Sequence, residues 1–558
     1  MRCRVLATFS SFTLLFVCMM FLGLGEERTV TVSAAEKPDA VCAGCHRAIY
    51  DRYEATAKAR GSGAAVNAVE PGKFLHQASG VEYRVFLREG SAWMSFNRSG
   101  GELTALHGER KLEYFVGSGR RGRTYLYQEG GEWFELPVNY YTHRKGWDMA
   151  PAYENVASMP GVLPTNPNCL HCHASQVEPS LPTAANRFAS APFLQSGIGC
   201  SACHGDPTSH LAQGGRGPII NPSKLSPAKR DSTCIQCHLE GDAVVYQAGR
   251  SLSTFRVGDD LADTAVYFVR SSQQSGGSRA TSQYEALLRS ACKRASGDRL
   301  TCTTCHDPHG SPSEPDRVQF FRTRCLACHS SPRIASSHHP EEPDCAQCHM
   351  PRRNTSDISH EQVSDHDIEA RPALPRPTAR VASEDLIPVG LSKAADREFG
   401  LAYAQRANHG ERASQERALR LLEKAAKKGV GDVDFLVELG FQRQVARDDA
   451  GARVAYEKAL AQNEYEPTAL ANLAVLEASA GKVKEAVHLL DRLVVADPSR
   501  TSAGLNLAFI VCRLGHSTEA LALIKNLQAF NPDDPALRTF LFQGDYAGQH
   551  CQVQPARM

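Results

Sequence analysis

The sequence predicts a two-part fold: a cysteine-rich region that is mostly α-helical and irregular with a small β insertion, followed by an all-α solenoid. Three observations predict it. A Cys-x-x-Cys-His motif occurs seven times between residues 42 and 349. Alternating apolar residues with paired glycines interrupt these motifs at about 71–145, which is typical of antiparallel strands. Beyond residue 390 the composition becomes helical and a 34-residue spacing recurs.

The repeated motif is the attachment signature of haem c. Two thiols separated by two residues lie on one turn of backbone and can both form thioethers with the haem vinyl groups. The histidine that follows is then held beneath the iron as its proximal ligand. Zinc sites, disulfides and redox Cys-x-x-Cys pairs leave a histidine after every pair unexplained. The sequence therefore predicts seven covalent haems c, attached at Cys42, Cys45 and His46; Cys169, Cys172 and His173; Cys200, Cys203 and His204; Cys234, Cys237 and His238; Cys302, Cys305 and His306; Cys325, Cys328 and His329; and Cys345, Cys348 and His349.

The sixth ligands of the irons bear directly on function. An iron with two protein ligands carries electrons, whereas an iron with an open face can bind a substrate. His210 and His309 follow their motifs too closely to reach their own irons easily, so each would more naturally reach a neighbouring haem. The other candidates are His76, His338, His339, His360 and His366, with His107, His143 and His171 as weaker ones.

The first motif has no histidine in the helical stretch that follows it. Lys58 lies where that helix could fold back towards an iron, and the alternative is a solvated surface lysine.

The N-terminus predicts export. Residues 1–34 combine a basic start at Arg2 and Arg4, an apolar stretch over about 5–24 and a small-residue site at Val32-Ser33-Ala34, as in a cleaved signal peptide. The alternative is an uncleaved anchor, because the apolar stretch is long enough to span a bilayer. Both place the remaining chain outside the cytoplasm, in the periplasm or anchored to the membrane. The formal net charge of +1 does not favour nucleic-acid binding.

The chain divides into a haem region and a repeat region. We expect the seven-haem domain over 36–370, with the β insertion at about 71–145 and haems serving as the core of the crowded motif region. A proline-rich linker is predicted at 371–390, and tetratricopeptide repeats at 391–545. A plain helical bundle is the alternative, and Cys512 is expected to be a core residue of a repeat helix. The 34-residue register is carried by Leu439, Leu473 and Leu507, by Ala452, Ala486 and Ala520, and by Pro498 and Pro532.

Residues of about 40–370 resemble the multihaem cytochromes c related to the small tetrahaem proteins that accept electrons from hydroxylamine oxidoreductase. The resemblance is to larger members with C-terminal tetratricopeptide repeats. It implies a multihaem cytochrome c fold with bis-histidine haems in stacked pairs, and His210, His309, His339, His360 and His366 as sixth ligands. The segments that carry it are VCAGCHRAIYDRY, VGSGRRGRTYLY, ELPVNYY, GWDMAPAY, GIGCSACHGDPTSH, LTCTTCHDPHG, DCAQCHMP and SDHDIEARP.

Two functions follow from these features. The first is an exported electron carrier whose repeats dock redox partner proteins. The alternative is an oxidoreductase that acts on a small nitrogen or sulfur compound at one five-coordinate haem. No Cys-x-x-Cys-Lys motif marks a lysine-ligated catalytic haem. Contact with the membrane is expected only if the signal remains as an anchor.

Overall fold

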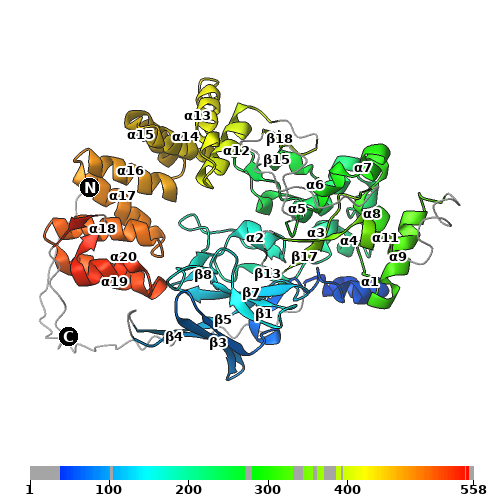
Figure 1. The fold of residues 1–558 in the computed structure, drawn as a ribbon. Coiled ribbons are helices and arrows are strands. Elements are labelled where there is room, and N and C mark those ends of the chain that lie inside the picture. The colour runs from blue at the N-terminus through cyan, green and yellow to red at the C-terminus, as the bar shows by residue number, and fades with distance from the viewer. Residues whose placement is uncertain are drawn as a thin grey trace, which may run out of the picture. The chain divides into compact units, whose positions relative to one another are not determined.

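The computed structural model describes residues 38–100, 105–270, 279–330, 344–355, 358, 361–369, 385–390, 394–546 and 548–551. Contacts divide the chain into residues 1–36 and residues 37–558, and the fold described below belongs to the second unit (Figure 1). The predicted signal segment, most of the linker, and His338, His339 and His360 lie outside the described residues. Within the described ranges, no helix is long and apolar enough to cross a membrane.

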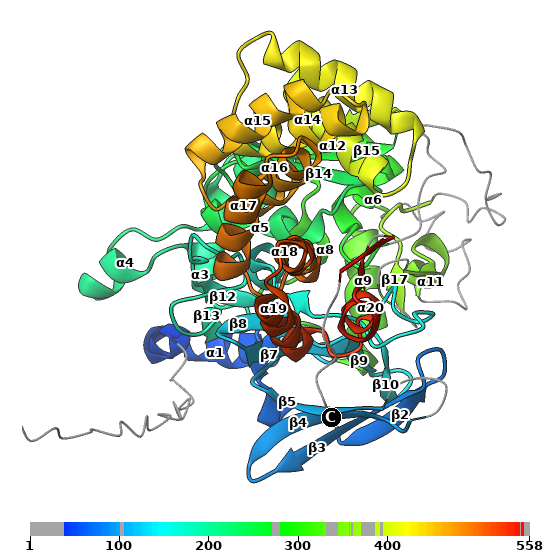
Figure 2. The same cartoon turned by 90° about the vertical axis from the view of Figure 1, so that its left-hand side faces the viewer.

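Strands fill a larger part of the N-terminal half than the small insertion predicted at 71–145. They begin at Ser62 and form a seven-stranded and a four-stranded antiparallel sheet, the second of which groups β2 to β5 (Figure 2). The alternation explains why: in β3 the side chains of Val81, Tyr83 and Val85 point inward and are buried, while their neighbours are not. The strands are β1 (Ser62–Ala64), β2 (Gly72–His76), β3 (Val81–Arg88), β4 (Ser91–Arg98), β5 (Leu106–Leu112), β6 (Tyr114–Val116), β7 (Gly122–Glu129), β8 (Glu132–Glu135), β9 (Val138–Tyr141), β10 (Gly146–Met149) and β11 (Leu163–Pro164).

The motif region is made of short helices, 3-10 turns and small sheets. Five of its described helices, α3, α4, α8, α9 and α11, contain no buried residue, although α9 is 13 residues long. Helices this short are not stable without packing, so their inner faces need a partner that the polypeptide does not supply. The helices are α1 (Ala43–Glu54), α2 (Pro167–His171), α3 (Ser201–His204), α4 (Thr208–Ala212), α5 (Pro227–His238), α6 (Gln283–Arg289), α7 (Ala291–Ser296), α8 (Cys302–Cys305), α9 (Glu314–Leu326) and α11 (Cys345–His349).

Small sheets and 3-10 turns connect these helices. The strands are β12 (Ala174–Val177), β13 (Phe193–Ser196), β14 (Ala243–Tyr246), β15 (Ala265–Arg270), β16 (Arg352–Asn354), β17 (Gln362–Ser364) and β18 (Leu386–Pro388), and the turns are η1 (Pro38–Cys42), η2 (Ala65–Asn67), η3 (Pro222–Lys224), η4 (Leu252–Thr254), η5 (Leu261–Asp263) and η6 (Gly297–Arg299). The end of the predicted linker is itself a strand, because β18 pairs with β15.

The repeats form helix pairs. Helices α14, α16, α18 and α20 begin 34 residues apart, at Val433, Pro467, Thr501 and Pro535. The small residues Ala452, Ala486 and Ala520 have no exposed surface, as expected where paired helices cross closely. The helices are α12 (Asp396–Asn408), α13 (Ala413–Ala426), α14 (Val433–Val445), α15 (Asp449–Gln462), α16 (Pro467–Ser479), α17 (Val483–Ala496), α18 (Thr501–Arg513), α19 (Ser517–Phe530) and α20 (Pro535–Gln543).

A disulfide joins the last repeats to the segment after them. Cys512 in α18 is bonded to Cys551, which follows the short strands β19 (Asp545–Tyr546) and β20 (Gln549–His550). Cys512 is buried, as expected of a core residue, but its sulfur is a crosslink and not a free thiol.

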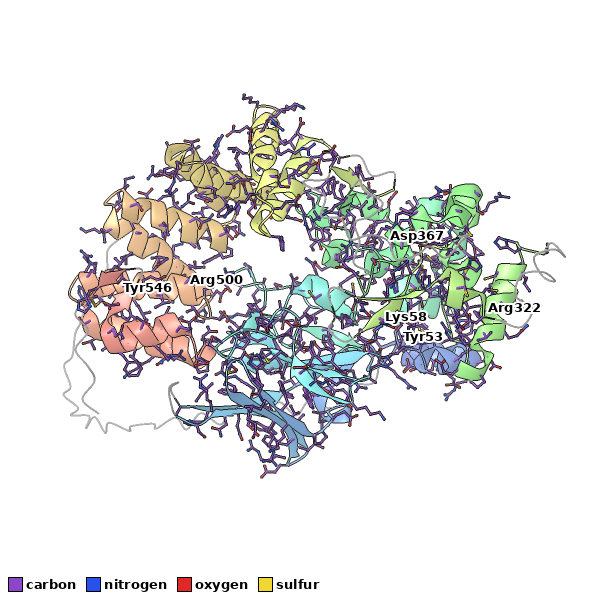
Figure 3. The ribbon with its side chains drawn as sticks, viewed as in Figure 1. Tyr53, Lys58, Arg322, Asp367, Arg500 and Tyr546 are labelled. Atoms are coloured by element: carbon purple, nitrogen blue, oxygen red, sulfur yellow. A yellow bond between two sulfur atoms is a disulfide. The ribbon has the colours of Figure 1, made fainter. Side chains whose placement is uncertain are left out.

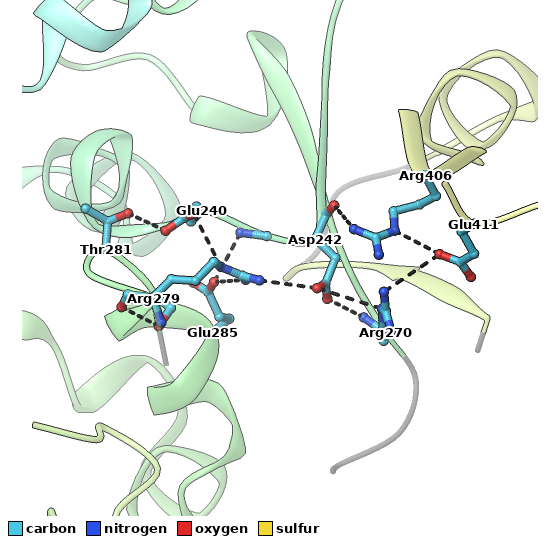
Figure 4. A network of polar contacts seen from close by, with 10 residues as sticks. Glu240, Asp242, Arg270, Arg279, Thr281, Glu285, Arg406 and Glu411 are labelled. Atoms are coloured by element: carbon cyan, nitrogen blue, oxygen red, sulfur yellow. Dashed lines mark hydrogen bonds and ion pairs between the residues drawn. The ribbon is translucent and has the colours of Figure 1, made fainter. Parts of the chain in front are cut away.

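The repeats are joined to the haem region at their first helix. The side chain of Gln405 in α12 both donates to and accepts from the backbone of Val244 in β14. Beside it, Asp242 accepts from Arg279 at 3.2 Å, and its backbone carbonyl accepts from Arg406 of α12 (Figure 4). Arg279 also contacts Glu240 and Glu285, and Arg270 contacts Glu411, so one network of ion pairs links the two regions.

The last repeats contact the β region. Asp533, between α19 and α20, accepts two hydrogen bonds from the guanidinium of Arg98 in β4, at 2.6 and 2.8 Å. Both side chains are buried, at 5% and 0% exposure. Phe530 of α19 belongs to the apolar core of the sheets, where its ring meets that of Phe134 edge-on. The repeat region is therefore an integral part of this unit.

Glu132 in β8, near Asp497 of the repeat region, makes the stability of the folded unit depend on pH. Its buried carboxylate accepts from Arg187 at 3.1 Å through one oxygen, and the other oxygen has no hydrogen-bond partner. Burial, together with the nearby charge of Asp497, raises the pKa of Glu132 to about 7. The folded state thus holds a proton that the unfolded state releases near its ordinary pKa of 4.5. We expect the stabilising effect to be complete below that value and lost as the pH rises through 7.

The melting temperature should accordingly be higher at pH 5 than at pH 8 because of this group, and Glu132→Gln should reduce the difference. Glu485→Gln, at an exposed position of α17, is the matched control. An unchanged pH slope in Glu132→Gln would contradict the assignment.

Candidate haem sites

All seven motifs lie on a single turn of helix or at its end. Motif four is complete within α5, motif seven is α11, and the others begin or end α1, α2, α3, α8 and α9. A helical turn places residues three apart on one face, so each pair of thiols points the same way. None of these fourteen cysteines is bonded to another. The local backbone therefore has the geometry that two thioether bonds to one haem require.

Thiols of different motifs meet in pairs. Four pairs of thiols from different motifs lie close enough for one to shift the pKa of the other: Cys42 and Cys200, Cys172 and Cys237, Cys234 and Cys302, and Cys325 and Cys345. The sulfurs of Cys42 and Cys200 lie within 4.8 Å of each other. Motif one thus lies beside motif three, motif two beside four, four beside five, and six beside seven. Cys203 of motif three acts on the pKa of Cys237, and Cys328 of motif six on that of Cys305, which connects these groups to one another. The motifs form one continuous cluster.

These contacts set the ionisation of the thiols. The neighbouring thiol of Cys302 lowers the pKa of Cys234 below its usual range, although burial opposes this. Burial and the nearby Asp39 raise the pKa of Cys200 to about 12. Burial also raises the pKa of Cys169 and of Cys325, each to about 11.

Two pairs of histidines have the spacing that a shared iron would need. The ring centroids of His204 and His309 lie 5.9 Å apart with the planes at 7°, and those of His306 and His366 lie 6.2 Å apart at 27°. Two metal–nitrogen bonds of about 2 Å, with the half-width of each ring, would give a separation of roughly 6 Å. The residues therefore fit a haem iron between each pair.

The hydrogen bonds of these histidines fit the same role. Nδ1 of His204 lies 2.8 Å from the carbonyl oxygen of Ile220, and Nδ1 of His366 lies 3.0 Å from that of Ser364. Because a carbonyl only accepts, Nδ1 carries the proton in both rings, and Nε2 is the deprotonated nitrogen available to bind iron. His210 and His349 make the same type of contact, with Gly217 and Glu369, and His238 makes it with the side-chain oxygen of Gln283.

Burial favours the neutral form of three motif histidines and of His366. Burial first, and then the charges of His366, Lys58 and His238, lower the pKa of His306 to about 4. Burial likewise lowers the pKa of His173, His238 and His366. The neutral imidazole is the form that binds a metal.

His76 differs from the other candidates. It is buried in the four-stranded sheet, with Nδ1 2.7 Å from the hydroxyl of Ser79 and Nε2 3.0 Å from the carbonyl oxygen of Glu154. Since that carbonyl must accept, Nε2 carries the proton, and both ring nitrogens are engaged. This arrangement is that of a structural histidine, so we leave His76 out of the ligand set proposed below.

Lys58 lies beside motifs three to five. Burial raises the pKa of Cys203, and the charge of Lys58 opposes this rise. Burial lowers the pKa of His238 and His306, and the charge of Lys58 adds to this effect. The backbone oxygen of Lys58 (Figure 3) accepts a hydrogen bond from the backbone N–H of Ile198, just before motif three. No described imidazole is paired with His46 of motif one.

Comparisons with known proteins agree with the motifs. The family model "Cytochrome c554 and c-prime" matches residues 139–205. The multiheme cytochrome MtrA of Shewanella baltica (strain OS185) is 26% identical over 185 residues, which cover 30% of this chain and 53% of MtrA. The chain thus matches about half the length of that relative.

Solved structures match about a quarter of the chain. A MamA protein is 14% identical, covers 25% of this chain and 74% of its own, and has a TM-score of 0.23. A tetratricopeptide repeat protein from Parabacteroides merdae ATCC 43184 is 19% identical, with coverages of 26% and 56% and a TM-score of 0.23. The repeats rest here on the 34-residue helix pairs themselves. In its motifs, and by the family model and the relative, the chain is similar to the multihaem c-type cytochromes, and its C-terminal helix pairs have the tetratricopeptide period.

Proposed function

We propose that this chain is an exported electron-transfer cytochrome that carries seven haems c. The observation that supports it best is the continuous cluster of motifs, in which thiols of neighbouring motifs lie close enough to affect each other's pKa. Haems attached at such thiols would be close neighbours, and electrons would pass between them. The proposed holders are the two cysteines and the histidine of each motif. Haem supplies a one-electron iron couple, whose potential its ligands and surroundings set.

The sixth ligands we propose are His309 for the haem of His204 and His366 for the haem of His306. His210, with its Nδ1 bound to Gly217, is a third. His339 and His360 remain proposals from the sequence alone. The chain's own contribution is to favour the neutral form of His306, His309 and His366, because burial lowers the pKa of each ring. Two neutral nitrogens on one iron favour electron transfer over substrate binding.

Export and docking complete the proposal. The signal-like residues 1–34 support a periplasmic or otherwise extracytoplasmic location, and so does the disulfide between Cys512 and Cys551, because disulfides persist in oxidising compartments. The repeats offer an extended surface of the kind that binds other proteins, which supports redox partners docked there.

One observation favours a second function. The helical stretch after motif one contains no histidine, and His46, like His173, His238 and His329, has no paired imidazole among the described residues, so its haem could keep one open face. The chain would then be an oxidoreductase acting on a small nitrogen or sulfur compound at that iron.

Two measurements on the purified, haem-loaded protein test these alternatives. Intact-mass spectrometry should find seven haem additions, and a smaller number would contradict the attachment sites. Electron paramagnetic resonance of the oxidised protein should show only low-spin irons. One high-spin iron that Cys42→Ser/Cys45→Ser removes would instead support the enzyme, whereas the same substitutions at Cys345 and Cys348 should leave it in place.

A further inference from the structure

The turn that follows α1 holds the backbone of Lys58 against the segment before motif three. Its carbonyl oxygen accepts a hydrogen bond from the N–H of Ile198 at 2.9 Å, and the hydroxyl of Tyr53 in α1 donates to the carbonyl oxygen of Ile198 at 2.7 Å. The two backbones approach so closely that a Cβ at Gly197 would collide with the carbonyl oxygen of Ala59. The position from which the Lys58 side chain extends is therefore fixed by contacts next to motif three.

The ammonium of Lys58 lies among the haem-binding residues of three motifs. Its side chain is exposed, and Figure 3 shows it where the turn after α1 meets the motif region. Its charge acts on thiols and imidazoles of motifs three, four and five and on one proposed sixth ligand, namely Cys203, Cys234, Cys237, His238, His306 and His309. Both thiols and the histidine of motif four are in this set, whereas motifs three and five contribute one motif residue each. Lys58 is thus associated most closely with motif four.

The carboxylates of this region already have cationic partners. Two of them act on the same thiols and imidazoles as Lys58 does. Of these, Asp307 lies 3.5 Å from the guanidinium of Arg52, and Asp231 lies 3.1 Å from that of Arg230. Lys58 itself forms no ion pair with a carboxylate of the described residues. A positive charge that cofactors screen from water is unfavourable unless an anionic group compensates it, so this ammonium needs an acidic partner that the described polypeptide does not supply.

Haem c brings such a partner, because each haem carries propionate groups. We propose that Lys58 is a positioning residue for electron transfer, whose ammonium holds a propionate of the haem attached at motif four and favours the reduced form of its iron. Reduction adds a negative charge, which a nearby cation stabilises, so the midpoint potential of that haem is raised. The inference rests on the proposed function, since it requires a haem at motif four.

The place of motif four in the cluster makes this potential important. Its thiols lie near those of motifs two, three and five. Electrons that cross between these motifs would pass through the haem attached there, and a higher potential makes that haem the preferred acceptor among its neighbours. Lys58 would then set the direction in which electrons collect within the cluster.

Potentiometric titration of the full-length, haem-loaded protein, followed by haem absorbance, tests the proposal. Lys58→Met keeps the length of the side chain but removes its charge, and should lower the midpoint potential of one haem by about 59 mV, a tenfold loss in its one-electron reduction equilibrium. Lys58→Arg keeps the charge and should keep the wild-type potential. The matched control is Lys224→Met, at an exposed position of η3 just before the helix that carries motif four, and it should leave every midpoint unchanged.

Electron paramagnetic resonance distinguishes a propionate partner from an iron ligand. Oxidised Lys58→Met should have as many low-spin irons as the wild type. A new high-spin iron would show that Lys58 binds iron, and would overturn the proposal. Equal midpoints in Lys58→Met and the wild type, or an equal fall in Lys58→Arg, would overturn it too.

Mass spectrometry keeps the test decisive if a variant loses a haem. Loss in Lys58→Met and Lys58→Gln, with retention in Lys58→Arg, would support the proposal, because the charge would then be needed to hold the haem. Loss in all three variants would contradict it. The number of haems on the wild type tests the proposed function separately.

Discussion

Replacing Asp533 with alanine is expected to destabilise the folded protein by about 3–5 kcal/mol, because it removes the buried carboxylate that accepts two hydrogen bonds from the buried guanidinium of Arg98. Asp533 is itself fully buried and accepts both guanidinium bonds, as well as one from the backbone N–H of Met159. Although burial opposes ionisation, the bonds from Arg98 hold the pKa of Asp533 below its usual range. The substitution therefore removes a charge that the fold has already stabilised.

Thermal and denaturant melting measure this effect. The matched control removes an ion pair that is exposed to solvent. Asp385→Ala breaks the contact of Asp385, which is 64% exposed, with Arg417, and should lower the free energy of unfolding by less than about 1 kcal/mol. Replacing Arg98 and Asp533 together with apolar residues should recover part of the loss, because no charge is then buried alone. Equal destabilisation by Asp533→Ala and Asp385→Ala would show that the buried pair contributes no more than a surface contact.

The same ion pair revises the role of the repeats. The sequence predicts them as a docking module that follows a linker, and the 34-residue register places their helices correctly. Nothing in that register indicates that Asp533 and Phe530, at the end of the third clear repeat, contact residues some 400 positions earlier. Such a contact depends on two surfaces that meet only after each part has folded. Partner binding and stability are therefore not separable by deleting the repeats.

Local patterns account for what was predictable. The period of two in β3 and the turns at paired glycines identify a β region, but its limits move from 71–145 to 62–164. Short strands such as β1 and β11 carry too few residues to show a period. The motifs identify the haem attachments because five adjacent residues contain all the chemistry.

Sixth ligands are a different problem, because each comes from elsewhere in the chain. His309 and His366 pair with rings 105 and 60 residues earlier. His76 resembles them in sequence, yet the neighbouring Ser79 and the distant Glu154 engage both of its nitrogens. The sequence places Ser79 only three residues from His76, but it gives no sign that the carbonyl of Glu154, 78 residues away, lies beside the ring. Only the folded structure therefore distinguishes a structural histidine from a ligand.

Replacing His366 with alanine is expected to convert one of the proposed seven irons from low spin to high spin. The ring of His366 faces that of His306, and its proton on Nδ1 leaves Nε2 directed to a metal, so alanine removes the sixth ligand and admits water. Electron paramagnetic resonance of the oxidised protein measures the change, and mass spectrometry should still find the same number of attached haems, because no thioether is altered.

His76→Gln is the control for this prediction, since His76 is also a buried histidine that the sequence offers as a ligand. Its ring hydrogen bonds to Ser79 and Glu154, so the substitution should leave every iron low-spin while lowering the melting temperature. If His366→Ala kept all irons low-spin and His76→Gln produced a high-spin iron, His76 would be the haem ligand and His366 would not. The hydrogen-bond pattern on Nδ1 and Nε2 would then not identify haem ligands in this fold.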